Sequence, residues 1–309
     1  MKKCKRLKST HRVIVIAHPV GQLGNRLFLS AHFIAFAHTF GFKICNPALG
    51  EYAEFFEGSQ GDVLCQFPKK RYSYPKCNPA LRCWLPRMIA KFTAALARIP
   101  KIEVLRCKVL DILSTNDCTD EPFPLRGEMF RKALAGSGYL LVRGWKFRDE
   151  ESLITHQQIV AQYFRPIASV RERIQSCVEQ ARKGANLLIG VHVRQGDYRE
   201  WLGGKYFYEL EDYHRWMQQA KTLWPDRKIA FLICSNTPCA TDAFPNCQTS
   251  NGPGDPIGDL YALAACDYLI GPPSTFSLWA SYYGRVPLHM LESKEQTLHP
   301  VSFKLHDRV

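Results

Sequence analysis

The chain has 309 residues, of which 46% are hydrophobic and 22% charged, and it carries a net charge of +13. This length exceeds what one hydrophobic core usually supports, so it predicts two domains, and the composition is that of a folded globular protein. The positive charge favours anionic partners, such as a phosphorylated substrate or an acidic lipid surface. No nucleic-acid-binding motif accompanies the charge, so we expect no nucleic acid among the partners.

The N-terminus is basic, and the apolar run that follows it, Val13–Ala17, is short. A signal-peptide core needs about 7–15 apolar residues and a membrane span about 20. We therefore expect a cytoplasmic protein in which residues 1–11 form a solvated basic tail. Weak peripheral attachment to an anionic inner membrane face is the alternative for this tail.

The first half of the chain begins with a β-α-β pattern. Val13–Ala17 is typical of a buried strand, a glycine-containing turn follows, and apolar residues at helical spacing continue to Gly41. Three more elements follow a second predicted strand at Phe42–Cys45: a helix after Pro86 and strands at Ile102–Leu105 and Tyr139–Val142.

A polar helical stretch from Ser152 to Lys183 separates the two halves, and a fresh α/β pattern follows it. Its predicted strands are Asn186–Val193, Lys228–Ser235, Tyr268–Gly271 and Val286–Leu291. Its predicted helices are Phe207–Leu223, Asp259–Ala265 and Ser277–Tyr283, the last capped by Gly284. The alternation predicts two α/β domains with mostly parallel sheets, at residues 1–165 and 166–309. Ligands in such folds bind beyond the carboxyl ends of strands, which directs attention to the loops after Ala17, Val193, Ser235 and Gly271.

The twelve cysteines include no Cys-x-x-Cys pair. The nearest grouping, Cys234, Cys239 and Cys247, misses the spacings of zinc sites. We expect these cysteines to be small buried side chains, with neither a metal nor disulfides.

The turn Gly21-Gln22-Leu23-Gly24-Asn25 stands between the first strand and its helix. Glycines here let backbone N–H groups approach an anion at the positive end of the helix. The pattern is not the Gly-x-Gly-x-x-Gly of a dinucleotide site, and no acidic residue ends the second strand. Both points argue against an NAD-dependent oxidoreductase.

The segment His192-Val193-Arg194-Gln195-Gly196-Asp197 ends the first strand of the second half. Side chains alternate along a strand, so His192 and Arg194 point the same way near its carboxyl end. Arginine suits a diphosphate because its planar guanidinium donates two parallel hydrogen bonds and keeps its charge. Gly196 permits a sharp turn, and Asp197 either orients Arg194 or accepts a proton. The combination predicts an anion site rather than a surface salt bridge.

A third segment, Pro272-Pro273-Ser274-Thr275-Phe276-Ser277, runs from a strand into a helix. Ser274, Thr275 and Ser277 are predicted to bind a phosphate at the helix N-terminus, with capping alone as the alternative. Asp259, in the preceding helix, is either an ordinary first-turn carboxylate or an acceptor for the N–H groups of a guanine base.

In this order, the three segments resemble motifs of the α-1,2-fucosyltransferases and their relatives, the α-1,6-fucosyltransferases and protein O-fucosyltransferases. These families carry a similar Gly-x-x-Gly-Asn turn, a His-x-Arg-x-Gly-Asp-type motif and a Ser/Thr-Phe-Ser segment. The resemblance spans both halves of the chain, although residues 47–183 contain no matching motif.

The resemblance implies a GT-B fold, in which two Rossmann-like domains with mostly parallel sheets face a central cleft. The N-terminal domain would bind the acceptor and the C-terminal domain the GDP-sugar. The implied reaction transfers L-fucose from GDP-fucose to a glycan hydroxyl, with inversion and without a metal or other cofactor, and an α-1,2 linkage is favoured. The implied donor-binding residues are Gly24, Asn25, His192, Arg194, Asp259, Ser274, Thr275 and Ser277.

The implied catalytic residues are Arg194, which would stabilise departing GDP, and a general base that takes the acceptor proton. Asp197 and Glu200 are both candidates for the base, because the family's glutamate lies at a different distance from the arginine. Gln195 replaces a second arginine that is common in the family, which would weaken the diphosphate grip or change the donor. The alternatives are a GT-B transferase that uses another nucleotide sugar, and a non-catalytic nucleotide- or glycan-binding protein.

Overall fold

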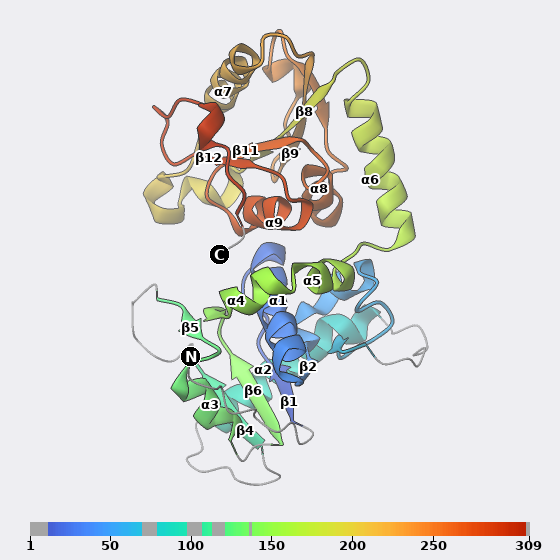
Figure 1. Ribbon diagram of the computed structural model, residues 1–309, viewed down its shortest axis with the longest axis vertical. Coiled ribbons are helices and arrows are strands. Elements are labelled where there is room, and N and C mark those ends of the chain that lie inside the picture. The colour runs from blue at the N-terminus through green and yellow to red at the C-terminus, as the bar shows by residue number, and fades with distance from the viewer. Residues whose placement is uncertain (1–11, 70–78, 98–106, 113–120, 136–137, 307–309) are drawn as a thin grey trace. The chain divides into compact units, whose positions relative to one another are not determined.

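The computed structural model describes residues 12–69, 79–97, 107–112, 121–135 and 138–306 (Figure 1). The chain divides into two compact units, Met1–Ile167 and Ala168–Val309, where the sequence placed the boundary after residue 165. Each unit is an α/β structure with a mostly parallel sheet, which is the predicted fold class. The predicted basic tail at residues 1–11 and the predicted strand at Ile102–Leu105 lie outside the described residues.

The sheet of the first unit has the strand order β3-β2-β1-β6-β4, and only β3 is antiparallel to its neighbour. Its strands are β1 (Val13–Ile16), β2 (Lys43–Cys45), β3 (Gln66–Phe67), β4 (Cys107–Asp111) and β6 (Tyr139–Arg143). A two-stranded sheet, β5 (Phe123–Pro124) with β7 (Phe147–Arg148), and helix α3 (Glu128–Leu134) complete this region. The core packs apolar side chains of β1, β2 and β6 against helix α1.

Helix α1 (Leu23–Phe40) is buried along most of its length, which explains its nearly unbroken apolar sequence. It ends, as predicted, at Gly41, whose φ of 73° is the left-handed conformation that glycine adopts without strain. The prediction for helix α2 (Pro79–Ala97) was wrong at its start, because Pro86 lies inside the helix. The buried Arg82 forms an ion pair with Glu54 of the 3-10 segment η1 (Pro47–Phe55), at 2.5 Å. This contact stabilises the turns of α2 that precede the proline.

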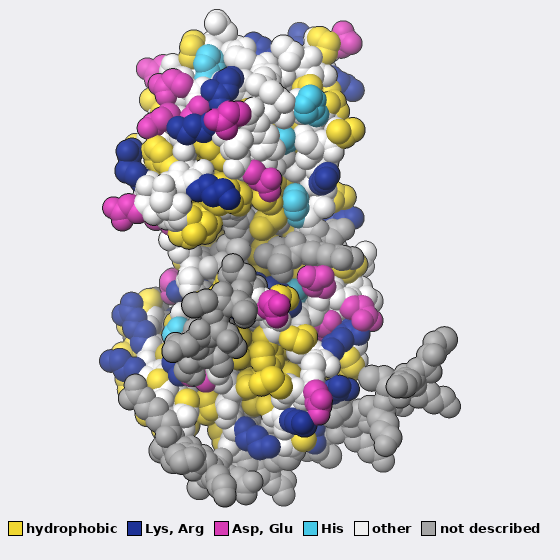
Figure 2. All heavy atoms as spheres, turned by 90° about the vertical axis from the view of Figure 1, so that its left-hand side faces the viewer, with side chains coloured by type: hydrophobic (Ala, Val, Ile, Leu, Met, Phe, Trp, Pro, Cys, Tyr) yellow, Lys and Arg dark blue, Asp and Glu magenta, His cyan; other side chains and the backbone are white. Residues whose placement is uncertain are grey.

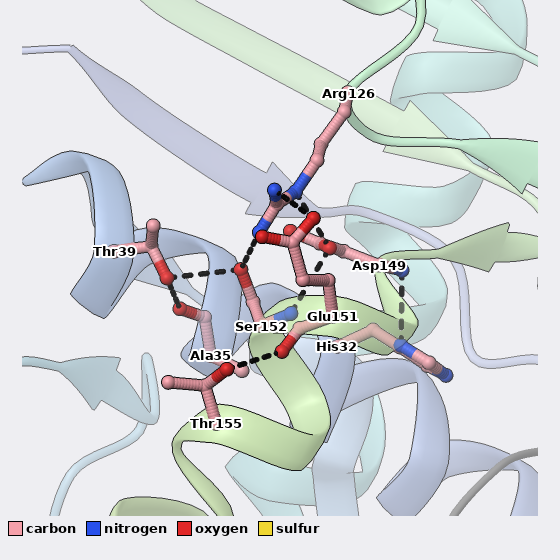
Figure 3. A network of polar contacts seen from close by, with 8 residues as sticks. All are labelled: His32, Ala35, Thr39, Arg126, Asp149, Glu151, Ser152 and Thr155. Atoms are coloured by element: carbon pink, nitrogen blue, oxygen red, sulfur yellow. Dashed lines mark hydrogen bonds and ion pairs between the residues drawn. The ribbon is translucent and has the colours of Figure 1, made fainter. Parts of the chain in front are cut away.

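The polar stretch predicted at Ser152–Lys183 is three helices, α4 (Glu150–Thr155), α5 (Gln157–Tyr163) and α6 (Ala168–Ala181). The gap before α6 contains Pro166, which disfavours helical geometry in the residue before it. Helix α4 is fastened to α1 by a hydrogen-bond network around Arg126 (Figure 3). Arg126 donates to Asp149 at 2.9 Å and to Ser152 Oγ at 2.9 Å, and Thr39 of α1 shares a 2.9 Å hydrogen bond with the same serine hydroxyl.

The sheet of the second unit is fully parallel, with the order β10-β9-β8-β11-β12. Its strands are β8 (Leu187–Val193), β9 (Ile229–Ser235), β10 (Gln248–Asn251), β11 (Tyr268–Gly271) and β12 (Leu288–Met290). Its main helices are α7 (Leu210–Leu223), α8 (Pro256–Leu263) and α9 (Thr275–Gly284). The chain proceeds from β8 outward in one direction and later from β11 in the other, so β8 and β11 flank a topological switch point (Figure 1).

Several details of the second unit differ from the prediction. Helix α8 begins at Pro256 rather than at Asp259. Strand β10 was not predicted, because its sequence is polar and partly exposed. Helix α9 begins at Thr275, includes Gly284 and is capped by Arg285 with a φ of 57°. Gly284 is required for space rather than for capping, since a Cβ there would lie 2.0 Å from the carbonyl oxygen of Ala264.

Across the described residues, we find no helix of the length and apolarity that crossing a membrane requires. The same residues contain no group of three or more His, Cys, Asp or Glu side chains placed to hold a metal ion.

Candidate functional site

The candidate site lies at the carboxyl edge of the second sheet, where the loops after β8, β9 and β11 meet. Two hydrogen bonds join these loops: Gln195 N–H donates to Asn236 Oδ1 at 2.9 Å, and Tyr198 Oη donates to the carbonyl of Pro273 at 2.6 Å. The three second-unit loops singled out from the sequence therefore meet in one place, at the switch point between β8 and β11 where such folds bind ligands.

His192 is the penultimate residue of β8, and its side chain bridges the switch point. Its Nδ1 lies 2.6 Å from Ser277 Oγ, and its ring packs over Phe276 with 4.9 Å between centroids. Burial, aided by the nearby Arg194 charge, lowers the pKa of His192 to about 3, so the ring is neutral at physiological pH. The space beside it is tight, because a Cβ on Gly271 would approach both His192 Cβ and Ser277 Oγ to 3.0 Å.

Arg194 leaves the same strand end and is held by groups on both sides. Its backbone N–H donates to Tyr213 Oη at 3.3 Å, its guanidinium donates to Asp197 Oδ2 at 2.8 Å, and it lies over the Tyr198 ring at 5.4 Å. The Arg194 side chain is 13% exposed, whereas that of Asp197 is 52% exposed. This arrangement keeps a permanent positive charge in a fixed orientation beside an open carboxylate.

Asn236, directly after β9, is a site residue that the sequence reasoning missed. Its Oδ1 accepts from Gln195 N–H, and its Nδ2 donates to Asp197 Oδ1 at 3.4 Å. The close approach explains Gly196, where a Cβ would lie 2.5 Å from Asn236 Nδ2. Its position could have identified it, because Asn236 begins the loop after Ser235 and that loop was already a candidate for ligand binding.

Gln195 has a structural role in this arrangement. Its Nε2 donates to the carbonyl of Tyr208 at 3.2 Å, and its Oε1 accepts from Thr237 Oγ1 at 3.3 Å. The Gln195 side chain therefore ties the loop after β8 to the loop after β9.

The serines at the start of α9 have different partners. Ser274 is the N-cap, with its Oγ accepting from Phe276 N–H at 3.2 Å, and Thr275 beside it is partly exposed. Ser277 is 1% exposed and its hydroxyl is paired with His192. The capping role predicted for Ser274 is confirmed, while phosphate binding by these hydroxyls stays a prediction.

Asp259 lies in the first turn of α8, beside the end of β9. Its Oδ1 accepts from Gly254 N–H at 2.8 Å, and its backbone carbonyl accepts from Cys234 Sγ at 3.6 Å. Burial raises the pKa of this carboxyl to about 6. Asp259 therefore belongs to the same sheet edge but to the β9–β10 side of it.

The remaining predicted residues are Glu200, Gly24 and Asn25. Glu200 is exposed and lies just after the short turn that contains Asp197. Gly24 and Asn25 belong to the first unit, where they form part of the first turn of α1 rather than a loop. Gly21 before them has a φ of 65°, and a Cβ there would lie 2.2 Å from Asn25 Nδ2. The closure of Gly24 and Asn25 over the donor stays a prediction.

Comparison with known proteins gives one family match and several structural matches. Residues 153–286 match the model described as Glycosyl transferase family 11. No curated protein matches the chain. The matched residues include the His192–Asp197 and Ser274–Ser277 segments.

The structural matches are to fucosyltransferases. A mutant of Arabidopsis thaliana FUT1 in complex with GDP has a TM-score of 0.58 at 14% identity, over 96% of this chain and 74% of that one. NodZ from Bradyrhizobium has a TM-score of 0.51 at 16% identity, over 94% and 98%. POFUT1 in complex with GDP-fucose has a TM-score of 0.52 at 12% identity, over 96% and 98%.

These matches confirm the resemblance drawn from the three motifs. The chain has the GT-B-type fold of the solved fucosyltransferases, and its residues 153–286 match the model of glycosyl transferase family 11.

Proposed function

We propose that this protein transfers L-fucose from GDP-fucose to a hydroxyl group of a glycan acceptor, with inversion and without a metal ion. An α-1,2 linkage is the one that the family resemblance favours. The observation that carries the proposal is the Arg194–Asp197 pair, held at the switch point beside the neutral His192–Ser277 pair. Structural matches in complex with GDP and with GDP-fucose support the choice of donor.

In the proposed reaction, the bond between the sugar carbon and GDP breaks as the acceptor oxygen attacks from the opposite face. Negative charge grows on the departing diphosphate, and the guanidinium of Arg194 stabilises it through charge-assisted hydrogen bonds. His192 is buried and neutral, so it contributes shape and a hydrogen-bonding edge rather than a second charge. Ser274 and Thr275 add hydroxyl groups at the N-terminus of α9, where the helix dipole favours a phosphate.

The acceptor hydroxyl must lose a proton to a base. Asp197 already accepts one hydrogen bond at each oxygen, from Arg194 and from Asn236, which suits it to orient the arginine. Glu200 is exposed on the following turn, and we assign the general base to it. Asp259 accepts one hydrogen bond from Gly254 N–H, and its remaining lone pairs would accept the N–H groups of guanine. Gly24 and Asn25, in the first unit, would also contact the donor.

The test is a transfer assay on an array of glycans, with GDP-fucose, GDP-mannose and UDP-galactose offered separately, with and without a metal chelator. We expect product only from GDP-fucose, at a rate that the chelator leaves unchanged. Product from another nucleotide sugar would assign a different donor. GDP binding without turnover of any donor, even by hydrolysis, would identify a non-catalytic binding protein.

A further inference from the structure

Helix α2 presents an apolar face to solvent. Four large side chains, spaced by three, four and four residues, lie on one face and form what we call the α2 stripe. Its members and their exposed fractions are Leu81 (39%), Trp84 (55%), Met88 (42%) and Phe92 (62%). Isolated exposed apolar residues are ordinary, but an aligned set with two aromatic rings indicates a surface that meets an apolar partner.

The opposite face of α2 packs against the protein and includes two buried polar side chains, Arg82 and Thr93. Arg82 is 3% exposed, forms the ion pair with Glu54 and donates to the carbonyl of Asp62 at 3.4 Å. Thr93 is fully buried and bonds to the carbonyl of Ile89 within the helix. Because Arg82 anchors one side of the helix inward, the α2 stripe is held outward.

The charged side chains of helix α2 itself are all basic. Arg87 and Lys91 are exposed and flank Trp84 and Met88 on the helix surface. Residues 63–102 contain no Asp or Glu in the sequence. The basic residues of that segment are Lys69, Lys70, Arg71, Lys76, Arg82, Arg87, Lys91, Arg98 and Lys101. On the face shown in Figure 2, basic and acidic side chains lie interspersed.

We propose that α2 is a membrane-surface helix that lies in the headgroup region of an anionic phospholipid bilayer. Apolar side chains that include Trp and Phe insert shallowly beside the acyl chains, while adjacent basic side chains attract the lipid phosphates. The charge favours this occupant over a second copy of the chain, because a symmetric α2–α2 contact would bring Arg87 and Lys91 against their like-charged counterparts. The proposal does not depend on which sugar or acceptor the enzyme uses.

The experiment is co-sedimentation of the full chain with two kinds of vesicle, one of phosphatidylcholine and one of equal parts phosphatidylcholine and phosphatidylglycerol. We expect binding to the anionic vesicles that is weakened by salt, and little binding to the neutral ones. The double variant Trp84→Ser/Phe92→Ser should bind the anionic vesicles at least about tenfold more weakly, because it removes the inserted apolar surface. Arg87→Gln/Lys91→Gln should weaken binding by about tenfold or more.

Matched controls separate the stripe from general surface properties. Met129 is 67% exposed and Val301 is 83% exposed, so Met129→Ser/Val301→Ser removes a comparable amount of exposed apolar surface elsewhere. Arg227 and Lys228 are both exposed, so Arg227→Gln/Lys228→Gln removes the same charge from the second unit. Both controls should bind the anionic vesicles like the unchanged chain.

Three results would overturn the proposal. One is an unchanged chain that does not sediment with anionic vesicles, and another is a control pair that weakens binding as much as the α2 variants do. The third is a dimer, seen by light scattering, that Trp84→Ser/Phe92→Ser dissociates, which would assign the stripe to a second copy. Circular dichroism of each variant checks that it is folded, which distinguishes loss of binding from loss of structure.

Discussion

Two arginine-centred networks, one in each unit, show why polar contacts alone do not identify a ligand site. In the first unit, Arg126 donates to Asp149, Glu151 and Ser152, and the carboxylate of Asp149 is 1% exposed (Figure 3). In the second unit, Arg194 pairs with Asp197, whose side chain is 52% exposed and lies just beyond the end of β8. The first network joins two helices within the fold, and the second stands where parallel strands end at a switch point.

The largest expected effect is the loss of transfer activity when Arg194 is replaced. Arg194→Ala should lower transfer by about a thousandfold or more, because it removes charge stabilisation that is needed as GDP departs. Circular dichroism and urea unfolding should show an intact fold. Arg227→Ala, at an exposed position of the same unit, is the control and should keep normal rates. Near-normal transfer by Arg194→Ala would mean that the site is misplaced.

The next largest effect distinguishes orientation from proton transfer. Glu200→Gln should lower the turnover rate by about a hundredfold with little change in GDP affinity, because a general base acts on the acceptor. Asp197→Asn should weaken GDP binding as well, because it releases Arg194 from its fixed position. The split between turnover and affinity for the two variants is the measurement. The reverse pattern would exchange the two roles.

Arg126→Ala tests the other side of the comparison. It leaves the buried carboxylate of Asp149 without its cation, so the free energy of unfolding should fall by about 2 kcal/mol, a value reduced because Arg126 is partly exposed. Urea unfolding measures this change, and calorimetry should show unchanged GDP affinity in the folded variant. A variant that is stable but cannot bind GDP would make this network part of the ligand site.

Ser277→Ala should have a smaller, combined effect. It leaves His192 Nδ1 buried without its partner, at a cost of about 1–2 kcal/mol, and it loosens the ring beside Arg194. The matched control is Ser281→Ala, one turn further along α9, whose buried hydroxyl donates to the carbonyl of Val286 at 2.7 Å. Both variants should lose stability in urea, but only Ser277→Ala should also weaken GDP binding.

A pH dependence of stability should appear in both units. Burial lowers the pKa of His32 and of His192 to about 3, below the ordinary 6.5. As the pH falls below about 6.5, the unfolded chain takes up these protons first, so stability should fall by about 1.4 kcal/mol per pH unit for each histidine. Urea unfolding of His32→Gln and of His192→Gln should each show a shallower slope.

Asp259 acts in the opposite direction over a narrower range. Its folded pKa of about 6 lies above the ordinary 3.8, so the folded chain binds this proton first as the pH falls through that window. Stability gained there partly offsets the loss from the histidines. Asp259→Asn should therefore steepen the loss of stability between about pH 6 and pH 4, and an unchanged slope would contradict the raised pKa.

The sequence predicted the central strands of both sheets, and the loops that meet in the second unit, because the information for both is local. The run at Val13–Ile16 is continuous and apolar, and His192, Arg194 and Asp197 occupy one strand end, so period and position were enough. Asn236 was missed because it becomes significant only when β9 lies beside β8 and brings its amide to Gln195. That pairing joins residues that are distant in the sequence.

The errors in helix boundaries have the same origin. Proline disfavours the interior of a helix, and the prediction for α2 therefore began after Pro86, yet the ion pair of Arg82 with Glu54 supports the preceding turns. Arg285 rather than Gly284 takes the left-handed position after α9, because Gly284 is needed where the helix approaches Ala264. In both places tertiary packing outweighed local preference.

The most direct test of the central claim is calorimetric titration of GDP into the full chain, with UDP as the reference nucleotide. The proposed donor site predicts saturable GDP binding, much weaker UDP binding, and a loss of GDP affinity of at least about tenfold in Arg194→Ala, because a charge-assisted contact to the diphosphate is removed. Equal affinity of the unchanged chain and Arg194→Ala for GDP, or no GDP binding by either, would contradict it.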